Sequence, residues 1–315
     1  MTTAPSAPLS PLTRRVTLAH RAEFAALRST IGALSVLPWN TAVAMGARLG
    51  LLGHWPVRIR RTVVREQIAF AFPELPQAEV ERIARESYIS LGTTTIETAL
   101  MASLDRQHLL DLVSETTGFH HFEDAHALGR GVIVVTGHLG NWELGGAYLA
   151  ARGVPMDAIV RRQGNPLFDR YLNETRRSLG IEIVNDFEAV RRIPRSFRAG
   201  RTVGFIADQG LLNLASTFVP FFGRLAKTPR GPGVFALRMG IPVIFAAMIR
   251  QPDGRYHMNL EPVPVHETGD READVDRVVA EYTQILERWV RQVPEQYFWH
   301  HKRWKWRPPG AGGAE

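Results

Sequence analysis

The chain has 315 residues, of which 45% are hydrophobic and 22% are charged. This is the composition of a globular protein with one large α/β domain or two small ones, and it excludes disordered and fibrous classes. The absence of cysteine excludes disulfides, thiolate zinc sites and a cysteine nucleophile, and it fits a reducing compartment. The net charge of +7 suits nucleic acid, an anionic membrane or an acidic substrate without choosing among them.

The N-terminal residues 1–56 are expected to form a helical segment that associates with a membrane. The chain start lacks the basic region and apolar core of a secretory signal. Residues 29–47 carry no charge and approach the roughly 20 residues needed to span a bilayer. Pro38 and Asn40 interrupt this stretch. They favour a helix or helical hairpin lying against the membrane over a single spanning helix, which stays the alternative.

Residues 57–308 are assigned to one α/β domain, and residues 309–315 to a disordered tail. Apolar residues at helical spacing predict helices from about 57 to 128. After Gly131, short runs of β-branched residues alternate with helical patterns, which predicts a largely parallel or mixed sheet with helical layers. After the run that follows Gly131, strands are expected at 157–160, 182–184, 202–207 and 243–248, helices at 166–179, 187–199 and 273–293, and an edge strand at 256–263.

The sharpest chemical signal is the run of residues 136–143, Thr-Gly-His-Leu-Gly-Asn-Trp-Glu, directly after the first predicted strand. Open α/β sheets bind ligands at the carboxyl ends of their strands. Imidazole has a pKa near neutrality, so His138 suits the role of a base that deprotonates an alcohol. Such a base needs a carboxylate to support the imidazolium, and Glu143 is one candidate. The alternative is a histidine that caps the following helix.

Two further clusters follow later predicted strands. Arg161 and Asn165 lie in the run Arg-Arg-Gln-Gly-Asn-Pro, and Arg176 follows one helix later. Arginine offers planar donors that match phosphate, although solvated surface arginine is the alternative. Asp208 and Gln209 end another buried strand, so Asp208 is a second candidate partner for His138, or a turn cap.

Aromatic residues are concentrated in two other segments. The run 218–223, Phe-Val-Pro-Phe-Phe-Gly, could line an acyl chain, and core packing is the alternative. Near the C-terminus, four cationic residues are interleaved with three tryptophans, a pattern that suits a membrane–water boundary. These residues are Trp299, Lys302, Arg303, Trp304, Lys305, Trp306 and Arg307. Ordinary solvated charge is the alternative.

Other catalytic schemes lack their motifs. The sequence has no G-x-S-x-G, P-loop, Rossmann fingerprint or H-E-x-x-H. No carboxylate stands at a supportive spacing from His300 and His301, so we predict no metal. We also predict that the protein needs no cofactor. No recognised nucleic-acid module accompanies the basic charge, so a nucleic-acid partner is not expected.

Five motifs in register resemble the late acyltransferases of lipid A biosynthesis and the related acyltransferases of phosphatidylinositol mannosides. They are GHLGNWELGG, the R-x-x-x-N-P run, ADQG, VPFFG-x-x-A-x-T-P-x-G and PEQYFWHHKRWKWRP, and the early AFAFPEL also looks like the family. The resemblance covers about residues 30–308 and implies a glycerolphosphate-acyltransferase-like α/β fold. It maps the family's His-x-x-x-x-Asp/Glu pair onto His138 and Glu143, its arginine onto Arg161, and its Asp-Gln onto Asp208 and Gln209.

The resemblance also implies a donor and a location. The donor would be a thioester of acyl carrier protein or coenzyme A, and the enzyme would lie on the cytoplasmic face of the inner membrane. We therefore expect an O-acyltransferase in which His138 activates a hydroxyl of a lipid acceptor without an acyl-enzyme. The acceptor is a lipid A precursor or another phospholipid or glycolipid. A non-catalytic protein of the same fold that binds anionic lipid is the rival.

Overall fold

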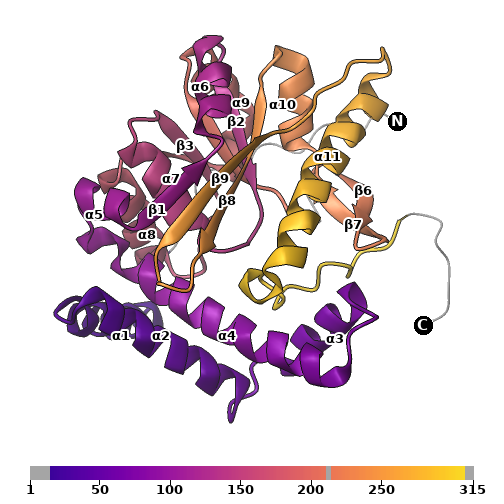
Figure 1. Ribbon diagram of the computed structural model, residues 1–315. Helices are drawn as coiled ribbons and strands as arrows, with labels where there is room; N and C mark the ends of the chain where they lie inside the picture. Colours follow the sequence, from indigo (N-terminus) through magenta and orange to yellow (C-terminus); the bar gives the residue numbers. More distant parts are fainter. Residues whose placement is uncertain (1–14, 211–213, 309–315) are drawn as a thin grey trace, which may run out of the picture.

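A computed structural model describes residues 15–210 and 214–308 (Figure 1). The tail predicted at 309–315 lies outside the described residues. The helices are α1 (Leu18–Ser35), α2 (Trp39–His54), α3 (Arg61–Ala71), α4 (Gln77–Leu100), η1 (Met101–Ser103), α5 (Arg106–Asp111), α6 (Phe119–Ala127), α7 (Trp142–Ala151), α8 (Pro166–Ser178), η2 (Asp186–Glu188), α9 (Ala189–Arg198), α10 (Gly231–Met239), α11 (Arg271–Gln292) and η3 (Pro294–Gln296). The strands are β1 (Val113–Thr117), β2 (Val132–Thr136), β3 (Met156–Val160), β4 (Ile181–Asn185), β5 (Thr202–Ile206), β6 (Ser216–Phe221), β7 (Arg224–Pro229), β8 (Val243–Arg250) and β9 (Tyr256–Pro262).

Seven strands form one mixed sheet in the order β1-β9-β8-β2-β5-β3-β4. The five strands from β8 to β4 are parallel to one another, whereas β9 is antiparallel to β8 and parallel to β1. The central strands β2 and β8 are buried over almost their whole length, as their continuous apolar runs predict. The predicted α/β class with a mixed sheet flanked by helices is therefore confirmed.

The prediction for the β9 edge is wrong. Residues 256–263 were expected to form an edge strand, but β1 covers β9, with Val113 beside Tyr256 and Thr117 beside Asn259. The segment that contains β1 was expected to be helical. Because β1 is short, polar and largely exposed, it has no apolar alternation that would distinguish it from a helix.

Helices cover both faces of the sheet. One face packs into a large core with α9, α10, α11 and the antiparallel β6–β7 ribbon, and α3 and α4 extend this core. The other face packs against α5, α6 and α7. In Figure 1, α4 runs along one end of the sheet, with α1 and α2 beyond it and α3 beside the end of α4. This end carries the carboxyl termini of the parallel strands, since Thr94 of α4 contacts Gly140 in the loop after β2.

Within residues 15–56, two consecutive helices, α1 and α2, are joined by a short connection, and their association with a membrane stays a prediction. Helix α2 packs on α4 through glycines. A Cβ atom on Gly50 would lie 1.9 Å from the carbonyl oxygen of Tyr88, and one on Gly92 would lie 2.2 Å from that of Gly46. No helix in residues 15–210 or 214–308 is both long and apolar enough to cross a membrane.

Candidate active site

His138 and Asp208 meet at the carboxyl edge of the sheet because their strands, β2 and β5, are parallel neighbours. The Asp208 Oδ1 lies 2.6 Å from the His138 Nδ1, and the backbone N–H of His138 donates to Oδ2 at 3.0 Å. The His138 side chain keeps 22% of its surface exposed, whereas the Asp208 side chain keeps 2%. The ring is thus held on one side by a buried carboxylate and remains accessible on another.

Asp208 is held in its ionised form. Burial by itself would raise the pKa of Asp208, but the charge and hydrogen bonds of His138 and the charge of Arg303 together lower it to about 2. An ionised carboxylate at Nδ1 fixes the imidazole tautomer that carries its proton there and leaves Nε2 able to accept a proton. Among the described residues, none is hydrogen-bonded to Nε2. The site can therefore perform general base catalysis.

Three other side chains contact the His138 ring. The Gln209 amide nitrogen lies 3.2 Å from Nδ1. Trp142 packs edge-on with its ring centroid 4.8 Å away, and Phe298 lies 5.8 Å away. The backbone N–H of Phe298 also donates to the His138 carbonyl at 2.9 Å. The structure therefore brings the predicted pair Asp208 and Gln209 together with His138.

Glu143 lies near this loop but pairs with Arg176. Its carboxylate oxygens accept hydrogen bonds from the Arg176 guanidinium at 3.0 and 2.5 Å, and both side chains are largely buried. Burial would lower the pKa of Arg176, but the Glu143 charge raises it. Of the two carboxylates that the sequence offered for His138, the structure places Asp208 in contact with the ring. Helix α7 begins at Trp142 after the Asn141 cap, not directly after His138.

The remaining predicted substrate ligands differ in exposure. Arg161 follows β3 at the same edge of the sheet and is exposed. Asn165 caps α8 by accepting from the Leu167 N–H at 3.0 Å, and its amide donates to the His20 carbonyl at 2.9 Å. Asn165 thus ties α8 to α1, a contact between distant segments that sequence spacing cannot reveal.

Each of the two aromatic segments is buried in part. Phe221 and Phe222 of the β6–β7 ribbon belong to the main core, which is the packing alternative. In the C-terminal segment, Trp299 is 1% exposed and Arg303 is 3% exposed. These two side chains therefore do not face a membrane, because they fill the interior behind the active site. Contact of the rest of the segment with a membrane stays a prediction.

The sequence analysis did not predict the buried position of Arg303 near the site. Its guanidinium donates to the Lys227 carbonyl at 2.6 Å and to the Thr228 hydroxyl at 2.7 Å. Its charge also helps to lower the pKa of Asp208. No local sequence signal separates Arg303 from the exposed Lys302 and Lys305, because long-range packing alone decides which of them turns inward.

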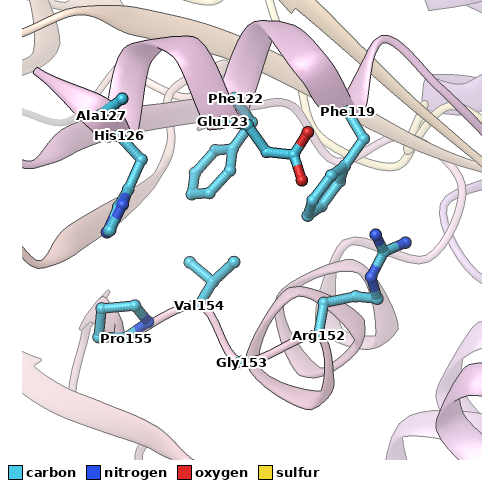
Figure 2. Close-up of a pocket in the computed structure, with 9 residues that line it drawn as sticks. All are labelled: Phe119, Phe122, Glu123, His126, Ala127, Arg152, Gly153, Val154 and Pro155. Atoms are coloured by element: carbon cyan, nitrogen blue, oxygen red, sulfur yellow. The ribbon is translucent and has the colours of Figure 1, made fainter.

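Neither the buried His300 nor a distant cavity adds to this site. Burial and the charge of Arg60 lower the pKa of His300 to about 4, and its ring packs edge-on to Tyr88. The described residues contain no group of three potential metal ligands. A cavity of about 260 Å³ lies between α6 and the turn before β3, lined by Phe119, Phe122, Glu123, His126, Ala127, Arg152, Gly153, Val154 and Pro155 (Figure 2). It stands at the amino ends of the strands, opposite His138.

Comparison with known proteins identifies the class of enzyme. The chain matches the family described as bacterial lipid A biosynthesis acyltransferase over residues 22–306. It is 27% identical to a lipid A biosynthesis palmitoleoyltransferase of Escherichia coli K12 and 26% identical to a lauroyltransferase of the same organism. These alignments cover 87% of this chain and 88% and 89% of the relatives. It is also 25% identical to a phosphatidylinositol mannoside acyltransferase of Mycobacterium tuberculosis over 76% of this chain and 75% of that one. With its histidine–aspartate pair at the strand ends, the chain belongs to the bacterial lipid A biosynthesis acyltransferase family and is an acyltransferase.

Proposed function

We propose that the enzyme moves a fatty acyl chain from a thioester to a hydroxyl of a lipid A precursor, with His138 as the general base. The observation that carries this proposal is the 2.6 Å contact between His138 Nδ1 and the buried, ionised Asp208. Relatives named as lipid A palmitoleoyl- and lauroyltransferases support the acceptor. The related phosphatidylinositol mannoside enzyme makes another glycolipid the second candidate acceptor.

The proposed reaction is a direct transfer. His138 Nε2 takes the proton of the acceptor hydroxyl while the hydroxyl oxygen attacks the thioester carbonyl. Asp208 stabilises the imidazolium that forms. The carbon–sulfur bond then breaks, and the departing thiolate receives the proton from the imidazolium. The donor is acyl carrier protein or coenzyme A carrying the acyl chain. The absence of cysteine and of a G-x-S-x-G motif supports a route without an acyl-enzyme.

Recognition of the acceptor phosphate is proposed for Arg161. Its guanidinium is exposed at the carboxyl edge of the sheet, where it could form two hydrogen bonds to a phosphate. Arg176 is already neutralised by Glu143, and Asn165 is engaged between α8 and α1. Gln209, beside His138 Nδ1, is proposed to orient the reacting groups.

Membrane attachment is proposed to occur through a docking surface made of α2 and residues 55–59. The small residues of α2 pack on α4, while Met45, Leu49 and Leu52 point outward and are 38%, 52% and 51% exposed. A soluble helix normally buries its large apolar side chains, so this reversed arrangement favours contact with lipid. Trp55, Val57 and Ile59 extend the surface.

Cations border this docking surface. Arg48 and Arg58 are exposed, and the Arg58 guanidinium lies over the Trp55 ring at 4.0 Å. Cations beside tryptophan suit the interface of an anionic membrane. Because α2 packs on α4 and α4 lies along the carboxyl edge of the sheet, docking here would hold the active site close to a lipid acceptor. We propose peripheral attachment to the cytoplasmic face of the inner membrane.

The test is turnover by purified protein with an acyl thioester and a lipid A precursor. We expect His138→Ala to lower the rate by about 10²–10⁴-fold, the usual contribution of a general base. The fold should be retained, because the ring is partly exposed. Undiminished turnover by folded His138→Ala protein would rule out this mechanism. Mass spectrometry of total lipids from cells with and without the gene would identify the acceptor and the chain.

A further inference from the structure

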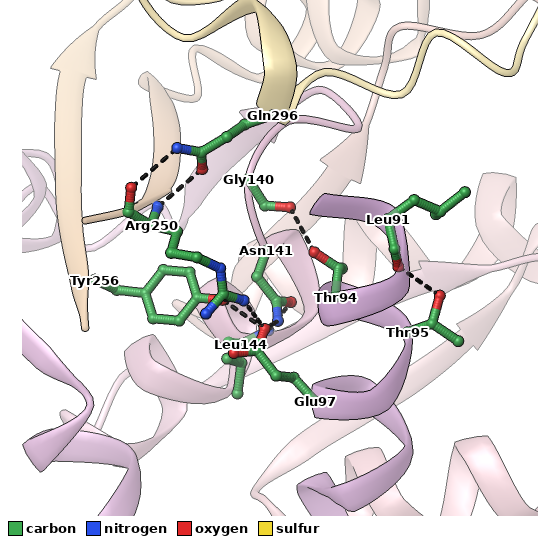
Figure 3. Close-up of polar contacts among 10 residues, drawn as sticks. All are labelled: Leu91, Thr94, Thr95, Glu97, Gly140, Asn141, Leu144, Arg250, Tyr256 and Gln296. Atoms are coloured by element: carbon green, nitrogen blue, oxygen red, sulfur yellow. Dashed lines mark hydrogen bonds and ion pairs between the residues drawn. The ribbon is translucent and has the colours of Figure 1, made fainter. Parts of the chain in front are cut away.

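A second buried carboxylate, Glu97 of α4, lies beneath the loop that carries His138. Glu97 is 0% exposed, and its Oε2 is a shared acceptor. The Asn141 amide donates to it at 2.8 Å, the Tyr256 hydroxyl donates at 2.5 Å, and the Arg250 guanidinium forms an ion pair with it. Figure 3 shows these side chains converging from α4, the catalytic loop and the two strands β8 and β9.

Asn141 links this cluster to the catalytic loop. It stands three residues after His138, and its side-chain oxygen accepts from the Leu144 N–H at 3.0 Å, which starts helix α7. Its backbone N–H donates to the Met248 carbonyl at 3.0 Å. One side chain therefore fixes the end of the loop, the beginning of α7 and the distance of both from α4.

Arg250 holds the same loop by a second route. Its backbone N–H donates to the Gln296 side-chain oxygen at 2.9 Å, and the Gln296 amide donates back to the Arg250 carbonyl at 2.9 Å. The Gln296 backbone carbonyl in turn accepts from the Gly140 N–H at 2.9 Å. The main chain of Arg250 thus reaches Gly140 through Gln296, while its side chain reaches Asn141 through Glu97.

The loop is also tightly confined at Gly140. This residue has φ +60°, and a Cβ atom there would lie 1.9 Å from the Met248 carbonyl oxygen. The Thr94 hydroxyl of α4 donates to the Gly140 carbonyl at 3.4 Å. Since the loop touches β8 on one side and α4 on the other, a change in the spacing of α4 and β8 would move His138 relative to Asp208.

We propose that the buried Glu97–Arg250 pair, acting through Asn141 and Gln296, positions the loop that holds His138 for catalysis. Glu97 would be a positioning residue, since it touches neither substrate nor the His138 ring. A buried ion pair is a costly way to gain stability, and apolar residues often replace such a pair without loss. Its fixed geometry, however, serves a site in which a displacement of about 1 Å can cost about 10²-fold in rate. This inference rests on the proposed role of His138.

The test compares Glu97→Gln and Asn141→Ser with the wild-type enzyme. Glu97→Gln removes the charge that holds Arg250. Asn141→Ser keeps an oxygen that can cap α7, and it removes the amide that bonds to Glu97. We expect each variant to lower kcat by about tenfold or more and to leave KM within about twofold, because substrate binding is not altered. The kcat of the double variant should be no lower than that of the less active single variant, because both changes break the same link between Glu97 and the loop.

Asp157→Asn is the matched control. Asp157 is also a buried carboxylate paired with an arginine, Arg201 at 2.6 Å, but it lies near the amino end of β3, away from His138. The Asp157→Asn substitution should lower the melting temperature without lowering kcat. A folded Glu97→Gln or Asn141→Ser enzyme with wild-type kcat would overturn the inference, as would an equal loss of kcat in Asp157→Asn. If Glu97→Gln does not fold, Asn141→Ser decides. Full activity in His138→Ala would instead refute the proposed function.

Discussion

Two neighbouring regions of the molecule depart from the usual distribution of side chains in opposite directions. At the carboxyl edge of the sheet, the charged residues Asp208, Glu97 and Arg303 are at most 3% exposed. On α2, which packs on the far side of α4, Leu49 and Leu52 are about half exposed. Burying charge and exposing leucine both cost stability in water. Each arrangement is understandable if the first region performs catalysis and the second meets lipid.

The comparison also separates what each region should do when altered. Changes in the buried charges should affect turnover and stability, because each of these groups forms hydrogen bonds to other residues of the interior. Changes on α2 should affect attachment to a membrane and leave the fold intact, since Leu49 and Leu52 already face solvent over about half of their surface.

The largest effect is expected from Asp208→Asn. An amide at this position cannot support the imidazolium as a carboxylate does, and it permits the wrong imidazole tautomer. Turnover should fall by about 10²-fold or more, while partitioning onto vesicles should stay unchanged. Steady-state kinetics and vesicle sedimentation measure the two properties. A variant that kept its rate would remove Asp208 from the mechanism.

The same aspartate should make stability depend on pH. Its pKa is lowered from 3.8 to about 2 in the folded protein, so its contribution is present above about pH 4 and is lost as the pH falls toward 2. The shift corresponds to about 2 kcal/mol of unfolding free energy. Denaturant titrations at a series of pH values should show this loss in the wild type. In Asp208→Asn the loss of unfolding free energy toward low pH should be smaller by that amount. If the unfolding free energy of the variant and of the wild type fell equally with pH, this prediction would be wrong.

The sequence predicted the edge of the sheet that carries His138 and Asp208 better than the contacts that support this edge. The β-branched runs of β2 and β5 are local signals, and because parallel neighbouring strands end at one edge, His138 and Asp208 could be expected close together. The burial of Arg303 and the pairing of Glu143 with Arg176 depend on residues distant in the chain. No spacing rule encodes such pairs. The same holds for β1, which is ordered by its pairing with β9.

For α2, the sequence showed an uncharged stretch but not its orientation. The glycines at 46 and 50 and the leucines at 49 and 52 fall on different faces, yet either face could have packed on α4. Close packing decides the choice, because only a surface without side chains allows α2 to approach Tyr88 and Gly92 so closely. The large apolar side chains are left outside.

Leu49→Ser combined with Leu52→Ser should therefore weaken attachment to vesicles and leave stability almost unchanged. Losing this partly exposed apolar area is worth about 2 kcal/mol, or about 30-fold in partitioning. The matched control is Leu128→Ser with Val190→Ser, since these side chains are also exposed but lie outside the docking surface. Equal partitioning of the two double variants would show that α2 does not meet the membrane.

The smallest effect is expected from Arg58→Gln. A cation near an anionic surface contributes about 1 kcal/mol, so binding to vesicles that contain anionic lipid should weaken about fivefold. Binding to neutral vesicles should not change, because the apolar part of the docking surface remains. High salt should likewise weaken binding of the wild-type protein to anionic vesicles without releasing the protein fully. Salt screens the charges of Arg48 and Arg58 but does not affect the apolar contacts of the leucines. Complete release by salt would mean that charge alone holds the protein on the membrane, and the apolar face of α2 would then need another explanation.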